Sequence, residues 1–134
     1  MSLDSALNNA QRNIPECVAM GVVDMQTGML LGAKTVDSHP QEVLDLVAAA
    51  TGDLYQGANV TAIEKLFKKS RGVADDGRHY FQEIIIFSEN LLHVFQRFKS
   101  NQDMVAVAVC RGSVNLGMAL SKTRLSVKEL EASV

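Results

Sequence analysis

The chain of 134 residues is 47% hydrophobic and 21% charged, with a formal net charge of −2, which is the composition of a globular domain rather than of a disordered or fibrous chain. So small a charge argues against a nucleic-acid-binding protein, and no apolar run approaches the about 20 residues of a membrane-spanning helix. The first residues also lack the basic and apolar regions of a signal peptide. We therefore expect one domain over residues 1–134, cytoplasmic, with no nucleic-acid partner and no membrane insertion.

The first third of the chain predicts a helix followed by a β-hairpin. Apolar or small residues recur at helical spacing over residues 3–13. Pro15 ends this helix, because the residue before a proline is pushed toward extended geometry. Residues 16–24 then alternate as a strand, and a second strand runs from Met29 to about Val36. The turn Gln26-Thr27-Gly28 between them favours a tight hairpin.

A broad apolar helix is predicted over residues 41–56. Asp37-Ser38-His39-Pro40 supplies capping side chains before a proline suited to the first helical position. Apolar residues occupy two neighbouring stripes of the helix, which indicates that more than one of its sides is covered. Helical spacing resumes over residues 61–69, and the polar stretch from Lys68 to Arg78 predicts an exposed loop.

Three strands and a helix complete the predicted chain. The final helix covers about residues 113–133, with a break near Leu125, because Ser126 and Glu129 have the spacing of a capping box. Short polar connections between the three strands favour antiparallel neighbours. These strands are Tyr80–Ser88, Leu91–Phe98 and Met104–Arg111.

The predicted fold class is α+β, an α/β sandwich. Its order is α-β-β-α-β-β-β-α, which fits a five-stranded antiparallel sheet with helices on both faces. The first and last strands each alternate large with small side chains, so we expect them to be central neighbours that share a large face and a small face. A helix would rest close to the small face, since strands that are apolar on both faces are covered on both.

Three stretches of the chain form a recognisable series. They are the strand and turn Ile14–Gly28, the helix Pro40–Leu54, and the strand Val105–Val109 with Gly112, Asn115 and Gly117 after it. In this order they resemble the opening strand, central helix and last strand of the roadblock/dynein light-chain family, a relative of the profilin-like and longin folds. The similarity covers most of the chain through loose patterns. The segment Asn59–Arg78 departs from the family by being longer and more charged.

The resemblance implies a homodimer. Members of this family act as adaptors, including subunits and activators of small GTPases, and commonly pair through the third strand. The uncharged run Ile84–Phe87 fits a paired edge, since an exposed one would invite aggregation. The stripe of the central helix is either core or dimer interface, and its breadth favours a share in both. The expected interface residues are Val43, Leu46, Val47, Ala50, Leu54, Ile84 and Ile86.

No motif for catalysis or for a cofactor is visible. Lys69-Ser70-Arg71-Gly72 lacks the upstream glycines of a P-loop. Cys17 and Cys110 lie in apolar runs and are expected to be buried, reduced thiols. The alternatives are a disulfide or redox pair, a zinc site that also includes His93, and a nucleophile at Cys110. We expect no enzyme activity, no metal and no cofactor.

Two polar clusters have both a functional and a structural interpretation. The first cluster is Asp75-Asp76-Gly77-Arg78-His79. Its functional interpretation is a binding loop or a weak cation site, and its structural interpretation is a solvated turn. The second cluster consists of four basic residues, Lys65, Lys68, Lys69 and Arg71. Its functional interpretation is a surface for an acidic partner, and its structural interpretation is a solvated helix end. The structural interpretation is favoured for both clusters.

The sequence thus predicts a non-catalytic homodimeric scaffold or regulatory subunit, with a small GTPase or a motor or signalling complex as its partner. The alternative is a small-molecule sensor. That function requires an apolar cavity between sheet and helix with a few convergent polar groups.

Overall fold

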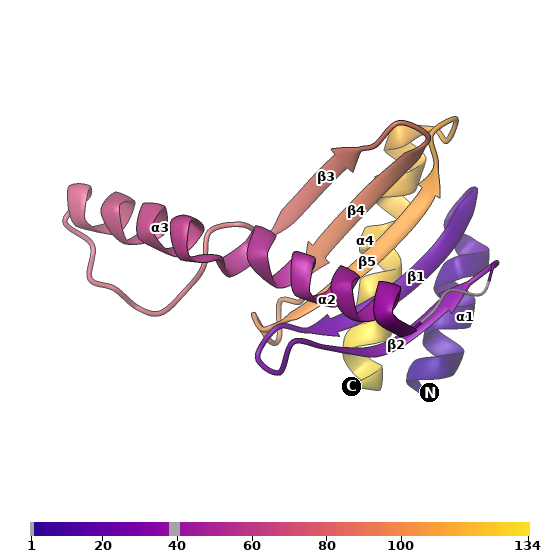
Figure 1. The fold of residues 1–134 in the computed structure, drawn as a ribbon, viewed down its shortest axis with the longest axis horizontal. Coiled ribbons are helices and arrows are strands. Elements are labelled where there is room, and N and C mark those ends of the chain that lie inside the picture. Colours follow the sequence, from indigo (N-terminus) through magenta and orange to yellow (C-terminus); the bar gives the residue numbers. More distant parts are fainter. Residues whose placement is uncertain (1, 38–40) are drawn as a thin grey trace.

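Five antiparallel strands form one sheet in the order β2-β1-β5-β4-β3. The structure is a computed structural model that describes residues 2–37 and 41–134. Helices α1 and α4 lie on one face of the sheet, and α2 crosses the other (Figure 1). The predicted fold class is confirmed. The elements are α1 (Leu3–Asn13), β1 (Cys17–Asp24), β2 (Met29–Thr35), α2 (Gln41–Gln56), α3 (Ala58–Ser70), β3 (Glu83–Phe87), β4 (Leu91–Arg97), β5 (Met104–Arg111) and α4 (Leu116–Ser133).

The central strands β1 and β5 are neighbours, as predicted, but they do not share a large face and a small face. Met20 lies opposite Ala108, and Gly21 lies opposite Val107. A large side chain of one strand therefore stands beside a small side chain of the other on each face. This pairing keeps both faces even, so that the helices can pack closely on either side.

Two apolar clusters form the core, one on each face of the sheet. The cluster beneath α1 and α4 contains Leu7, Met20, Val22, Leu92, Val94 and Leu130. The cluster beneath α2 contains Val23, Met25, Ala48, Tyr55, Phe95, Val105 and Val107.

The helical region after the hairpin consists of two helices. Helix α2 ends at Gln56, and Gly57 is the N-cap residue of α3. The amide of Gly57 donates to the carbonyl of Asp53 at 3.1 Å, and its own carbonyl accepts from Thr61 at 2.9 Å. The predicted helix over residues 61–69 is thus α3, which begins three residues earlier. The predicted helix start at Asp37–Pro40 lies partly outside the described residues.

Helix α4 is continuous, so the predicted break near Leu125 is wrong. Its cap is Asn115, whose side chain accepts a hydrogen bond from the amide of Met118 at 2.9 Å. Ser126 is buried within the helix and does not cap a second one. The helix therefore begins later than predicted, at Leu116, and packs along its whole length.

The two edges of the sheet differ in character. Edge strand β2 pairs with β1 through a register shift at Val22 and Val23. It also carries Lys34, whose ammonium lies 2.8 Å from the Asp4 carboxylate of α1. Edge strand β3 carries no charged side chain after Glu83. Irregularity and charge are the features that discourage strand addition. Strand β2 has both, whereas β3 is regular and uncharged from Ile84 to Phe87.

Candidate functional site: the β3 edge, the α2 stripe and the open sheet face

The β3 edge is apolar on both faces of the sheet. Ile84 and Ile86 point to the α2 side, where they pack against the core. Ile85 and Phe87 are exposed, Phe87 by 62%. Glu83, the one charged residue of the strand, forms two hydrogen bonds with the Arg124 guanidinium of α4, at 2.7 and 2.9 Å. From Ile84 to Phe87 the strand therefore offers an uncharged edge to another chain.

The structure divides the predicted interface residues of α2 between surface and core. Leu46 is 70% exposed, Val47 is 41% exposed, and Ala50 is also exposed. Leu54 is half-buried and packs against the core cluster, as Ile84 and Ile86 do. Val43 lies in α2, but its side chain is outside the described part of the chain. The exposed members form an apolar stripe that could meet a partner, and their role in a dimer stays a prediction.

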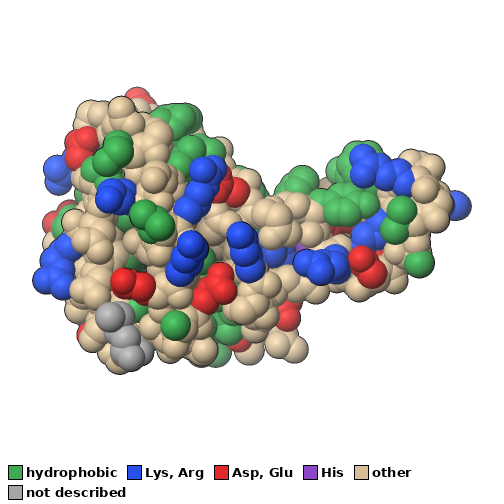
Figure 2. Space-filling model, turned by 180° about the vertical axis from the view of Figure 1, so that it is seen from behind, with side chains coloured by type: hydrophobic (Ala, Val, Ile, Leu, Met, Phe, Trp, Pro, Cys, Tyr) green, Lys and Arg blue, Asp and Glu red, His purple; other side chains and the backbone are tan. Residues whose placement is uncertain are grey.

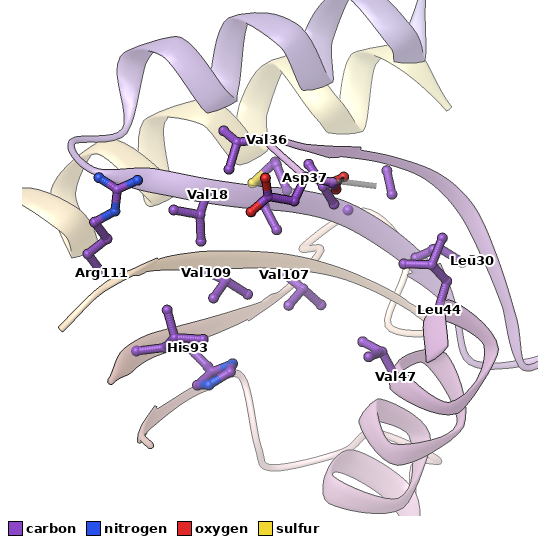
Figure 3. A pocket seen from close by; sticks show the side chains of 16 residues that line it. Val18, Leu30, Val36, Asp37, Leu44, Val47, His93, Val107, Val109 and Arg111 are labelled. Atoms are coloured by element: carbon purple, nitrogen blue, oxygen red, sulfur yellow. Dashed lines mark hydrogen bonds between the residues drawn. The ribbon is translucent and has the colours of Figure 1, made fainter. Parts of the chain in front are cut away.

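A hollow of about 470 Å³ opens on the α2 side of the sheet (Figure 3). It exists because α2 covers only one end of the sheet face and leaves the other end open. Polar groups are few and lie near the rim, among them Arg111 and Asp37. The sequence left a cavity between sheet and helix open as the requirement of a small-molecule sensor, but it did not indicate which residues would line it. The hollow is lined by Ala19, Val107, Val109 and His93 of the sheet and by Leu44 and Val47 of α2.

His93 lines the hollow, with its Nε2 atom 3.0 Å from the hydroxyl of Ser88. It lies on the same strand face as Leu91, as predicted, and opposite Ile86 of β3. Burial holds the pKa of His93 below its ordinary value, because the charged imidazolium is less well solvated there.

The lowered pKa of His93 predicts a pH dependence of stability. The unfolded chain takes up a proton near pH 6.5 while folded His93 stays neutral, so its contribution to stability is present above about pH 6.5 and is lost as the pH falls toward the folded pKa. Urea unfolding at about pH 7.5 and about pH 5.5 should show a smaller loss of stability for His93→Gln than for the unchanged chain. Equal losses would contradict this assignment.

Tyr55 and Arg97 fix the angle at which α2 crosses the sheet. The Arg97 guanidinium lies 4.7 Å from the centre of the Tyr55 ring and donates to the carbonyls of Phe81 at 2.8 Å and Gln102 at 2.7 Å. The Tyr55 hydroxyl donates to the carbonyl of Gln82 at 3.0 Å. Both side chains are buried, and burial raises the pKa of Tyr55 and lowers that of Arg97. The C-terminal part of α2 is thereby held over the beginning of β3.

Residues 58–80 form an arm that extends beyond the β3 edge (Figure 1). The arm consists of α3 and a return segment, joined by Glu64. One Glu64 oxygen lies 2.8 Å from Nδ1 of His79, and the other accepts from the amide of Tyr80. Glu64 is buried, although it sits in a helix that projects from the body. The segment Asn59–Arg78, which departs from the family pattern in the sequence, therefore belongs to an ordered structure.

The two polar clusters of the sequence meet within this arm. Lys68 is buried and contacts the carboxylates of Asp75 at 3.1 Å and Asp76 at 3.2 Å and the carbonyl of Arg78 at 2.7 Å. Burial opposes the charge of Lys68, but the two carboxylates outweigh it and raise its pKa. A hydrogen bond from the Gly77 amide, together with Lys68, lowers the pKa of Asp75. The prediction that this basic cluster is a solvated helix end is therefore wrong for Lys68. Its ammonium group occupies the position that a bound metal cation would take beside the two carboxylates.

Cys17 and Cys110 are buried, free thiols that face each other across β1 and β5. Their mutual hydrogen bond lowers the pKa of Cys17 and raises that of Cys110. Both belong to the core beneath α1 and α4, whereas His93 lies on the other face of the sheet. The alternative zinc site is therefore wrong. Cys110 is fully enclosed and has no access to a substrate.

The described residues contain no cluster of three or more His, Cys, Asp or Glu side chains that would hold a metal ion. Within the same residues, no helix is both long and apolar enough to cross a membrane.

Comparison with solved structures identifies the fold. A structure of MglB with a tetrameric arrangement has a TM-score of 0.72 at 18% identity, over 98% of this chain and 90% of that chain. The gliding protein MglB of Thermus thermophilus has a TM-score of 0.68 at 19% identity, over 98% and 87%. A roadblock/LC7 domain from Streptomyces avermitilis has a TM-score of 0.69 at 12% identity, over 98% and 97%. The chain has the roadblock/LC7 fold.

No protein-family model matches the chain, and no curated protein matches it. At these identities the likeness concerns the roadblock/LC7 fold alone. A fold hosts many functions, so the role of this chain depends on its own surfaces.

Proposed function

We propose that the protein is a non-catalytic homodimer that serves as a scaffold or regulatory subunit for a small GTPase or for a motor or signalling complex. The observation that carries the homodimer is the β3 edge. Its outer backbone groups face no other strand of the described sheet, and the run from Ile84 to Phe87 lacks the charge that normally protects an edge. The exposed stripe of α2 adds apolar surface on the sheet face to which Ile84 and Ile86 point.

The regulatory role is supported by likeness. Solved structures named MglB and roadblock/LC7 share the fold, and the sequence resembles a family whose members include subunits and activators of small GTPases. The protein would act by presenting a surface that two copies build together, because each copy alone leaves its edge strand unpaired.

Light scattering coupled to size-exclusion chromatography tests the homodimer. We expect twice the chain mass of 14.6 kDa at micromolar concentration. Leu46→Lys places a charge in the α2 stripe without disturbing the core and should weaken dimerisation at least about tenfold. Met29→Lys is the matched control, because Met29 is 62% exposed at the start of β2, on the opposite edge.

A single-chain mass for the unchanged protein would refute the homodimer. The GTPase partner needs a second experiment, in which proteins from the native host are captured on the unchanged chain and on Leu46→Lys and identified by mass spectrometry. A GTPase retained by the unchanged chain and lost with Leu46→Lys would support the proposal. A GTPase bound equally by both would mean that the pair is not needed for binding.

The hollow favours a second candidate function, a small-molecule sensor. Its volume of about 470 Å³ falls in the range of ligand pockets, and its apolar lining with polar groups at the rim has the usual character of one. Native mass spectrometry of the purified protein separates the two functions. A co-purified metabolite bound to each chain would favour the sensor, and a ligand-free dimer would favour the scaffold.

A further inference from the structure

We propose that in the homodimer the arm of each copy lies in the hollow of the other copy. This inference rests on the proposed homodimer and names a second contact within it. It joins two features that are each left open in one chain: a projecting helix with an exposed apolar stripe, and a sheet face that α2 does not cover.

The arm presents its apolar residues to solvent. Ile63, Leu66 and Phe67 follow the spacing of one helical face and are all exposed, Leu66 by 63%. Glu64 and Lys68 point to the return segment instead, where they are buried. Figure 2 shows hydrophobic side chains gathered on the arm beside Lys and Arg. An ordered helix with such a face is expected to have a partner.

The arm and the hollow lie at opposite ends of β3. The hydrogen bond from Tyr55 to Gln82 places the exit of α2, and hence the root of the arm, at the beginning of β3. The hollow includes His93, which pairs with Ile86 near the end of β3. The chain therefore cannot place its own arm in its own hollow, because the arm leaves the sheet at the wrong end and points away from it (Figure 1).

Symmetry brings the two features together. Antiparallel pairing of two β3 strands requires a two-fold axis through the edge and perpendicular to the sheet. This rotation keeps the α2 side of both copies on the same side of the joined sheet and exchanges the two ends of β3. The partner's arm then crosses the edge at the end where the hollow lies.

The length of the arm matches the distance it has to cover. Helix α3 has 13 residues, which at about 1.5 Å per residue is about 20 Å. Neighbouring strands lie about 4.8 Å apart, so an arm of this length that starts near the β3 edge spans β3, β4, β5 and β1. The floor of the hollow is formed by β4, β5 and β1, with β2 beyond them. Leu66, two-thirds of the way along α3, would lie over β5.

The area that a stable dimer buries also supports this contact. A stable dimer buries about 1,200–2,000 Å² in total. Two five-residue strands paired edge to edge cover far less than that by themselves. Two arms seated in two hollows would add apolar surface on one continuous face, adjoining the paired strands and the stripe of α2.

Cross-linking between engineered cysteines tests the proposal. Leu66→Cys on the arm and Arg111→Cys on the exposed rim of the hollow are introduced into one full-length chain, which is treated with a short bis-maleimide. We expect a covalent dimer on a denaturing gel that requires both cysteines. The controls are each single variant and Leu66→Cys combined with Met29→Cys on the far edge, none of which should cross-link. The native Cys17 and Cys110 are buried.

Light scattering of the same sample keeps the two proposals apart. A dimeric mass without a covalent dimer would overturn the seating of the arm and leave the homodimer intact. A single-chain mass would overturn both. As a second measurement, Leu66→Glu should weaken dimerisation at least about tenfold, and Met29→Glu should leave it unchanged. Equal dimerisation of these two variants would also overturn the seating of the arm.

Discussion

Replacing Arg97 with alanine is expected to lower the free energy of unfolding by about 3 kcal/mol or more. Arg97 is 1% exposed, and its guanidinium donates to the carbonyls of Phe81 and Gln102 and lies against the Tyr55 ring. Alanine would leave the carbonyls of Phe81 and Gln102 without this donor and would open a cavity beneath α2. Urea unfolding at a fixed protein concentration measures the loss, since dimerisation makes stability depend on concentration.

Arg97→Lys is the informative control. Lysine keeps the charge but lacks the planar fork that reaches two carbonyls at once, so it should recover part of the stability and not all of it. If Arg97→Ala changed the unfolding free energy by less than about 1 kcal/mol, the Arg97 contacts could not be what holds α2 over β3.

The second large effect is expected at Glu64. Glu64→Ala removes the acceptor for the Tyr80 amide and the partner of His79, so the arm should open locally while the sheet stays folded. Loss of the acceptor of the Tyr80 amide and of the His79 contact should cost about 1–3 kcal/mol, which corresponds to about 5- to 150-fold more frequent opening. Hydrogen exchange followed by mass spectrometry should show this acceleration in peptides from residues 58–80 and not in those from β5.

Two further variants make the Glu64 test specific. Glu64→Gln keeps an acceptor for the Tyr80 amide and should cause a smaller acceleration. Lys65→Ala changes the neighbouring, exposed side chain of the same helix and should cause none. Acceleration spread over the whole chain would mean that Glu64 stabilises the domain as a unit, contrary to our expectation.

The strands and their order were predictable because the alternation of side chains along a strand follows directly from which face of the sheet is buried. In β5 successive side chains point alternately to the two helix layers, so the pattern from Met104 to Cys110 is apolar on both faces. The start of β3 was predicted three residues too early, at Tyr80. There the chain is directed to other partners, since the Tyr80 amide donates to Glu64 and the Phe81 carbonyl accepts from the Arg97 side chain.

The arm and the hollow could not be predicted, because both depend on contacts far apart in the sequence. Lys68 appears as an ordinary helix-end lysine until the return segment brings Asp75 and Asp76 to it. The hollow depends on the angle of α2, which the contacts of Tyr55 set. The exposure of Leu46 was compatible with the predicted stripe, but periodicity alone could not separate it from half-buried Leu54.

The contrast between the two sheet edges limits how far this protein can polymerise. Strand addition at β3 uses up the edge of each copy that is regular and, from Ile84 to Phe87, uncharged. The outer strands of the resulting ten-stranded sheet are then both β2. There the register shift and Lys34, held by Asp4, obstruct a further chain. Raising the protein concentration should therefore fill the two-chain state without seeding fibres.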